Sequence, residues 1–238
     1  SLFTMRFVGT PFTFAFEQVG TNCGLIGKNA AVEVDGAAYW MSDNGFFRFT
    51  GKLESMDCLV EDYVYDDLNT TSNQFIYCGI NNLFGEVMWF YPTADSNVVN
   101  RCVVYSYLDS TPSRPIWYTN ANSLYPRTTW VDSSVFGLPH ATLYDAGTDT
   151  SFDVTGNTEG ITIYYEHETG VNQVKGGVTA AIPANITSGD YDITQKVVRG
   201  AATNLGDLRG DGENIMRVSR IIPDFISQEG NALVQLDL

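Results

Sequence analysis

Residues 31–49, AVEVDGAAYWMSDNGFFRF, decide the fold, because they hold three short strand-like runs separated by two turns. The turns are Asp35-Gly36 and Asp43-Asn44-Gly45, and such pairs favour the left-handed backbone that tight hairpins require. The stretch therefore predicts an antiparallel meander. Its strands are expected at Ala31–Val34, Ala37–Met41 and Phe46–Phe49.

The same alternation continues on both sides of this meander. Upstream, Leu2–Val8 and Phe12–Phe16 flank Gly9-Thr10-Pro11 and predict a hairpin in which Phe12, Phe14 and Phe16 share one face. Short strands also recur downstream, separated by turns rich in Asn, Asp, Gly, Ser and Pro. They are expected at Phe75–Cys78, Glu86–Tyr91, Arg101–Leu108, Ile116–Tyr118, Thr128–Val131, Ala141–Tyr144 and Ile161–Glu166.

This spacing indicates an all-β protein, built either as a β-propeller of antiparallel meanders or as a β-sandwich. We favour the propeller, because groups of three or four strands follow one another with aromatic residues at a similar point in each group. These are Tyr39-Trp40, Trp89-Phe90-Tyr91, Trp117-Tyr118 and Tyr164-Tyr165.

One short helix is expected within the strand-rich sequence, with Asp57 as its N-cap. Its apolar side would hold Leu59, Val60, Tyr63, Val64 and Leu68, and its acidic side Glu61, Asp62, Asp66 and Asp67. We interpret the acidic side as the solvated face of an amphipathic helix, with a site for a metal or a basic partner as the alternative.

The composition changes near residue 175, which predicts two regions. Residues 1–176 would form the propeller-like region, and residues 177–238 a smaller C-terminal β region. The last strands are expected at Ile215–Ile222 and Ala232–Leu238.

Charge limits the function. The 238 residues carry 28 Asp and Glu against 13 Lys and Arg, a formal net charge of −15. A protein that grips nucleic acid through its phosphates needs a basic contact surface, so the balance argues against a general DNA binder. The acids are dense between Arg127 and Lys175, where no Lys or Arg occurs.

Cysteine spacing argues against a zinc site, because Cys23, Cys58, Cys78 and Cys102 form no CxxC pair. Each lies in or beside an apolar run, so we expect buried free thiols, with disulfides as the alternative. The Asn-x-Thr sequons at Asn69 and Asn185 would matter only in a secreted protein. No stretch of the sequence approaches the length of a membrane span.

Catalytic motifs are scarce. The sequence has no GxSxG, GxxxxGK[ST] or HExxH motif, and no GxGxxG after a strand. In Glu166-His167-Glu168 alternate side chains would point apart, so we expect a charged strand end and no site. The loop Asp207–Glu213 resembles a calcium loop only in composition. We expect no catalytic residue, no cofactor and no metal.

Long, ordered strings of sequence carry a family resemblance. The chain resembles the tail-hub, or nozzle, proteins of short-tailed bacteriophages, which stabilise packaged DNA. Members of that family are longer, so the resemblance implies a portion or a short form. The strings are Cys23–Val32, Asp35–Phe47, Cys58–Asn69, Glu86–Pro92, Arg127–Asp132, Tyr165–Val171 and Arg220–Phe225.

The resemblance implies a virion structural protein and not an enzyme. Its members form rings, typically hexamers, of propeller-containing subunits that build the DNA ejection channel of the phage tail. The implied partners are the portal and adaptor proteins, a tail spike or fibre, a tail needle or plug, and genomic DNA in passage, without membrane insertion. The implied location is the virion tail, after assembly in the host cytoplasm.

Acidity is compatible with such a channel, because acidic walls repel the DNA backbone and neither grip nor stall it. We expect Asp145, Asp149 and Asp153 to line the channel. The alternative is that net acidity only keeps the protein soluble. As a different class of function, a secreted β-propeller that binds or cleaves carbohydrate stays open.

Overall fold

The computed structural model describes residues 1–120, 127–145, 161–175, 178–182, 187 and 233–234. Two compact units divide the chain, Ser1–Pro183 and Ala184–Leu238. Almost all described residues belong to the first unit, and every strand assigned in them pairs antiparallel with its neighbour. The all-β prediction is confirmed for this part of the chain.

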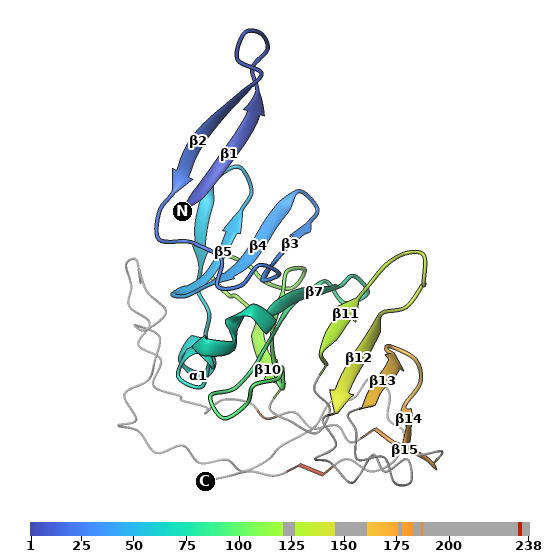
Figure 1. The fold of residues 1–238 in the computed structure, drawn as a ribbon. Coiled ribbons are helices and arrows are strands. Elements are labelled where there is room, and N and C mark those ends of the chain that lie inside the picture. Colours follow the sequence, from blue (N-terminus) through green and yellow to red (C-terminus); the bar gives the residue numbers. More distant parts are fainter. Residues whose placement is uncertain (121–126, 146–160, 176–177, 183–186, 188–232, 235–238) are drawn as a thin grey trace. The chain divides into compact units, whose positions relative to one another are not determined.

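Three antiparallel sheets follow one another along the first unit (Figure 1). In each sheet the strands lie in sequence order, so each is a meander. Sheet I contains β3 (Ala31–Val34), β4 (Ala37–Ser42), β5 (Gly45–Phe49) and β6 (Leu53–Met56). Sheet II contains β7 (Tyr77–Asn81), β8 (Glu86–Tyr91), β9 (Arg101–Ser106) and β10 (Trp117–Asn120). Sheet III contains β11 (Thr129–Val131), β12 (His140–Asp145) and β13 (Ile161–Glu166).

The first turn of sheet I has the predicted chemistry. Asp35 and Gly36 connect β3 to β4 with φ angles of 51° and 80°. Both values lie in the left-handed region that a two-residue hairpin turn requires, and Asp-Gly adopts it readily. The Glu33 carboxylate also accepts a hydrogen bond from the Gly36 amide at 2.6 Å. This local geometry sets the register of the meander.

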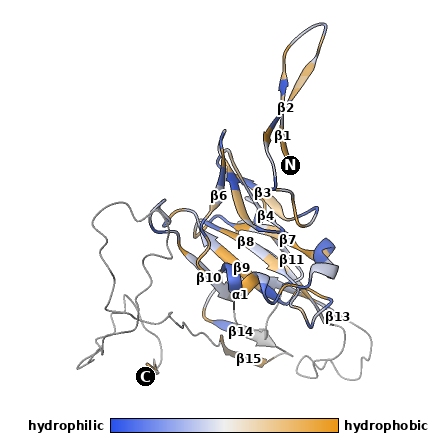
Figure 2. Ribbon diagram, turned by 90° about the vertical axis from the view of Figure 1, so that its left-hand side faces the viewer, coloured by the Kyte–Doolittle hydropathy of each residue, from blue (hydrophilic) through white to orange (hydrophobic). Residues whose placement is uncertain are grey.

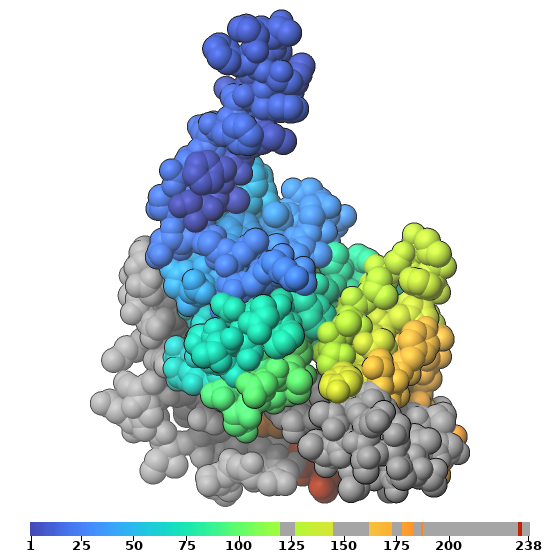
Figure 3. Space-filling model, viewed as in Figure 1, coloured from blue at the N-terminus to red at the C-terminus, as the bar shows by residue number. Residues whose placement is uncertain are grey.

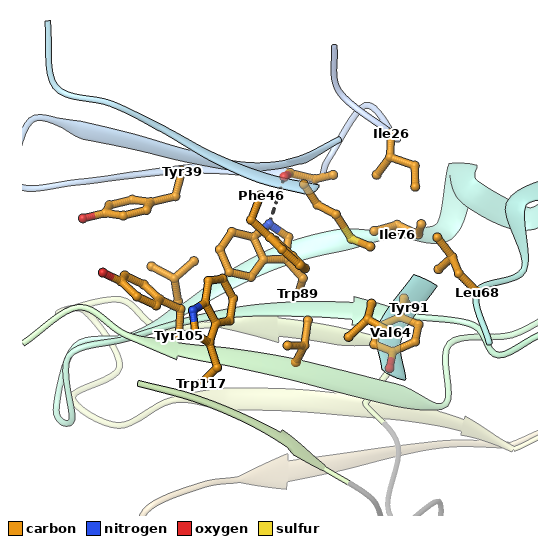
Figure 4. Close-up of a cluster of buried hydrophobic side chains, with 14 of the residues drawn as sticks. Ile26, Tyr39, Phe46, Val64, Leu68, Ile76, Trp89, Tyr91, Tyr105 and Trp117 are labelled. Atoms are coloured by element: carbon orange, nitrogen blue, oxygen red, sulfur yellow. Dashed lines mark hydrogen bonds between the residues drawn. The ribbon is translucent and has the colours of Figure 1, made fainter. Parts of the chain in front are cut away.

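Sheets I and II pack face to face through an aromatic core (Figure 4). Phe46 on β5 lies 4.9 Å from Trp89 on β8 and 4.9 Å from Trp117 on β10, measured between ring centroids. Tyr39 on β4 contacts Tyr105 on β9 in the same layer. Alternation along each strand places these rings on the facing sides of the two sheets.

The opposite side of sheet II packs against sheet III. Phe90 stacks on Trp130 of β11 with centroids 6.1 Å apart, and Met88, Cys102 and Val104 are buried in the same cluster. Sheet II is therefore buried on both faces, which explains why β8 and β9 are almost continuously apolar.

The first strands of the three sheets contact one another, β3 with β7 and β7 with β11. The Cys78 amide donates to the Asn29 carbonyl at 2.8 Å, just ahead of β3. The Trp130 indole N–H of β11 donates to the Ile80 carbonyl of β7 at 2.7 Å. In each sheet the first strand, which is an edge strand, therefore lies next to the first strand of the neighbouring sheet.

Helical structure differs from the prediction. Helix α1 covers only Glu61–Tyr65, and its N-cap is Val60, without a side-chain cap. Asp57 is not the cap, and its carbonyl instead accepts the Trp117 indole N–H at 2.8 Å. The chain at Asp57 is therefore tied to sheet II before the helix begins.

The apolar side of α1 is also narrower than expected. Val64 and Leu68 are buried in the core between sheets I and II, while Leu59 and Tyr63 are exposed. A one-turn helix can direct only a few side chains to one surface. A second helical segment, the 3₁₀-helix η1 (Thr70–Phe75), was not predicted.

Two further hairpins complete the described strands. Strand β1 (Leu2–Phe7) pairs with β2 (Phe14–Gly20), so Phe14 and Phe16 share a face as predicted, but Phe12 precedes the strand. Strand β14 (Asn172–Lys175) pairs with β15 (Val178–Ala181), and neither was predicted. Leu233 and Val234 are exposed and lie outside any strand, and the rest of the predicted C-terminal strands lie outside the described residues.

Candidate functional surfaces

The residues predicted to line a channel are placed only in part. Asp145 is the last residue of β12 and pairs with Ile161, the first residue of β13. Asp149 and Asp153 lie outside the described residues, on the segment that joins these two strand ends. Only Asp145 is therefore placed, at one end of sheet III, and the role of the three acids in a channel stays a prediction.

Metal binding has no support in the described part of the chain. No group of three or more His, Cys, Asp or Glu residues in it could hold a metal ion. The loop Asp207–Glu213 lies outside that part.

The acidic side of α1 has an internal partner. The Asp67 carboxylate accepts from the Arg101 guanidinium at 2.7 Å, and Arg101 also lies over the Tyr63 ring, 5.1 Å from its centroid. Asp62 and Asp66 are exposed. Burial raises the pKa of Glu61, with a smaller contribution from the neighbouring carboxylates. The arrangement fits the solvated face that we expected.

Glu166, His167 and Glu168 do not converge, as expected. Glu166 is exposed at the end of β13. His167 accepts a hydrogen bond from the Arg127 Nε at 2.8 Å, and Glu168 accepts one from the Asn81 amide at 3.0 Å. His167 and Glu168 thus contact different partners, Arg127 and Asn81, and the three side chains do not form a single site.

Buried surroundings keep His167 neutral. Burial lowers its pKa to about 4, and the charge of Arg127 acts in the same direction. The hydrogen bond from Arg127 also requires an unprotonated Nε2, so the proton of the neutral ring lies on Nδ1.

One carboxylate pair was not found from the sequence. The Asn81 amide donates to Glu86 at 3.3 Å and to Glu168 at 3.0 Å, and Tyr118 also hydrogen-bonds to Glu86. Burial raises the pKa of Glu168, although the bond from Asn81 opposes the shift. No local pattern links residues so far apart in the chain, and only the packing of sheets II and III brings them together.

The cysteines are free thiols, as predicted, so the disulfide alternative is wrong. Burial raises the pKa of Cys58 to about 12 and also raises those of Cys78 and Cys102. Since the thiolate is the reactive form, these three thiols are poor nucleophiles.

At the first of the two sequons, both ends of the Asn69 side chain form hydrogen bonds within the fold. Its side-chain oxygen accepts from the amides of Thr71 and Ser72 at 3.0 and 3.2 Å and so caps η1. Its side-chain nitrogen donates to the Ser96 carbonyl at 2.7 Å. Both ends of the amide are therefore engaged, which does not suit a glycan acceptor.

The β1–β2 hairpin is the most unusual surface of the described chain. Figure 2 shows hydrophobic colour along both of its strands, and in Figure 3 its dark blue atoms meet the other coloured atoms only at its base. At that base Leu2 packs beside Trp40 and Phe47 of sheet I. Phe3, Met5, Phe7, Phe14 and Phe16 are all exposed. The alternating sequence predicted a shared face but could not show that the face is uncovered.

Comparison with known proteins assigns no family. No protein-family model and no curated protein sequence matches this chain. In the described part, the structure contains no helix that is both long and apolar enough to cross a membrane.

Proposed function

We propose that this chain is a structural subunit of a phage tail, a ring-forming nozzle protein that builds the DNA ejection channel and helps to retain packaged DNA. The observation that carries the proposal is the series of three meanders stacked face to face with their first strands in contact. Consecutive blades of a β-propeller have this relation. The arrangement thus supports the propeller-containing fold that the family resemblance implies.

The stacking favours a propeller over a β-sandwich. A sandwich buries one face of each of two sheets, whereas sheet II is buried on both faces. We therefore assign sheets I, II and III as successive blades, with β3, β7 and β11 nearest the propeller axis.

The acidic composition supports DNA as a passing cargo. Residues 128–174 carry seven acids and no Lys or Arg. A channel wall of this composition repels phosphates, so DNA slides past without being bound. We propose that Asp145, Asp149 and Asp153 contribute to that wall, and that the portal and adaptor, the spike or fibre and the needle contact the ring.

Negative-stain microscopy and mass photometry of the native assembly test the proposal. A nozzle subunit forms closed rings of about six copies with a central pore. A monomer that binds glycans would instead establish the secreted carbohydrate-binding propeller. The free thiols and the engaged Asn69 amide give that second function no support.

A further inference from the structure

The β1–β2 hairpin carries its charged side chains on one face and its large aromatic side chains on the other. Directly paired residues project to the same side of a two-stranded sheet. The pairs Phe7–Phe14, Met5–Phe16 and Phe3–Gln18 lie on one side. The pair Arg6–Ala15 and the pair Thr4–Glu17 lie on the other side. Both charges of the paired strands are thus on one face, and the opposite face is entirely uncharged.

The uncharged face has no cover within the described chain. Its five large apolar side chains are each between 50% and 72% exposed. Phe12, in the loop between the strands, is 75% exposed. An isolated two-stranded hairpin is only marginally stable in water, so a covered apolar face is the favourable state of such an element.

The area of this face fits a second copy of the same chain. With about 200 Å² for a large apolar side chain, the exposed parts of the five residues on this face amount to about 600 Å² on one protomer. A stable protein–protein interface buries about 800 Å² on each partner. Two hairpins packed face to face would therefore bury about 1,200 Å² in total, at the lower end of the standard range for a specific interface.

Charge also favours this contact. The chain carries a net charge of −15, so two copies repel each other over most of their surfaces. The uncharged hairpin face avoids that repulsion. It is also self-complementary, because the same aromatic side chains meet on both sides of a two-fold axis.

We propose that the apolar face of the β1–β2 hairpin packs against the same face of a second copy, in a two-fold symmetric contact. This inference goes beyond the proposed function and does not rest on it. The contact joins two protomers if the chain forms no ring, and it joins two rings if the chain forms one.

The test replaces Phe7 and Phe16 by serine in the full chain. These two side chains lie on different strands of the apolar face and are its most exposed members, at 72% and 70%. The matched control replaces Arg6 and Ala15, the neighbouring residues on the polar face, also by serine. Fluorescence of the four tryptophans, all of which lie in sheets I to III, checks that the sheets stay folded.

Light scattering coupled to size exclusion measures the mass of each form at the same concentration. The proposal predicts that the Phe7→Ser/Phe16→Ser variant has half the mass of the unsubstituted chain, while the control keeps the full mass. A change from twelve copies to six supports both proposals. A change from two copies to one supports the hairpin contact and contradicts the ring.

Equal masses for the variant and the unsubstituted chain overturn the hairpin contact. Six copies in both would leave the nozzle proposal standing, and one copy in both would contradict it as well. Flotation with vesicles of phosphatidylethanolamine and phosphatidylglycerol gives a further overturning result. Phenylalanine-dependent flotation combined with unchanged masses would assign the face to a lipid surface.

Discussion

At the scale of single residues, close packing between sheets II and III depends on a missing side chain. A Cβ atom at Gly79 would lie 2.7 Å from Cδ1 of Trp130, which is closer than such atoms approach each other. Gly79 has no positive φ angle, so the requirement is steric and not conformational. The glycine lets Trp130 lie against β7 and reach the Ile80 carbonyl.

Gly79→Ala should therefore lower the free energy of unfolding by about 1–3 kcal/mol, the usual cost of overpacking. Chemical denaturation followed by tryptophan fluorescence measures it. Gly24→Ala is the control, because a Cβ there meets nothing closer than 3.9 Å, and its stability should stay within about 0.5 kcal/mol of the unsubstituted protein. Equal stability of the two variants would contradict the packing of Trp130 on Gly79.

His167 gives a pH dependence with a definite sign. Its pKa is about 4 in the folded chain and about 6.5 in an unfolded one. Below pH 6.5 the unfolded chain therefore binds a proton that the folded chain does not bind until about pH 4. This contribution to stability is fully present above pH 6.5 and is lost as the pH falls toward 4.

The expected loss is about 1–2 kcal/mol, after allowance for the partial exposure of the ring. Denaturation at a series of pH values measures it. His167→Gln removes the titrating group, so subtracting its pH profile from that of the unsubstituted protein isolates the contribution of His167. Parallel profiles between pH 6.5 and 4 would show that the ring is not held neutral.

At the scale of elements, the Tyr65 side chain links α1 to sheet I through hydrogen bonds. The Tyr65 Oη donates to the Ser42 carbonyl at 2.7 Å and accepts from the Gly45 amide at 3.2 Å. Burial raises the pKa of Tyr65, so the phenol stays protonated and able to donate. The bonds join the helix to the turn between β4 and β5.

Tyr65→Phe should destabilise the protein by about 1–2 kcal/mol, because it removes the donor and leaves buried backbone groups without a partner. Tyr63→Phe on the same helix keeps its ring under Arg101 and should change stability by less than about 0.5 kcal/mol. Thermal unfolding compares the two variants. Similar melting temperatures would contradict the role given to Tyr65.

The sequence correctly predicted the elements that depend on residues close together in the chain. The Asp35-Gly36 turn, β8 and β13 lie where the sequence places them, because turn chemistry and alternation act over a few residues. Asp57 was wrongly assigned as a cap because its partner, Trp117, is distant in sequence. The shared amide of Asn81 between Glu86 and Glu168 was missed for the same reason.

At the scale of the whole molecule, the placement of acids can be tested through DNA binding. If Asp145, Asp149 and Asp153 line the proposed channel, lysine at these positions would turn an acidic wall basic. Each new phosphate contact adds about 0.9 to the slope of log K against log salt concentration. The assembled Asp145→Lys/Asp149→Lys/Asp153→Lys variant should therefore retain duplex DNA at low salt and release it as the salt concentration rises.

The control makes the same charge change on the described surface, at Asp43, Asp62 and Asp66, which are all exposed. Filter binding should show much weaker DNA retention for this control and none for the unsubstituted assembly. If both variants bind DNA equally, net charge alone accounts for the effect, and the three acids have no special place in a channel.

Ring assembly from propeller blades is the central claim, and a cryo-electron microscopy reconstruction of the native assembly tests it most directly. The account predicts a closed ring with a central pore, in which sheets I, II and III radiate from one axis in each subunit and β3, β7 and β11 lie nearest that axis. A monomer, or an assembly without a pore whose sheets pair as a sandwich, would contradict it.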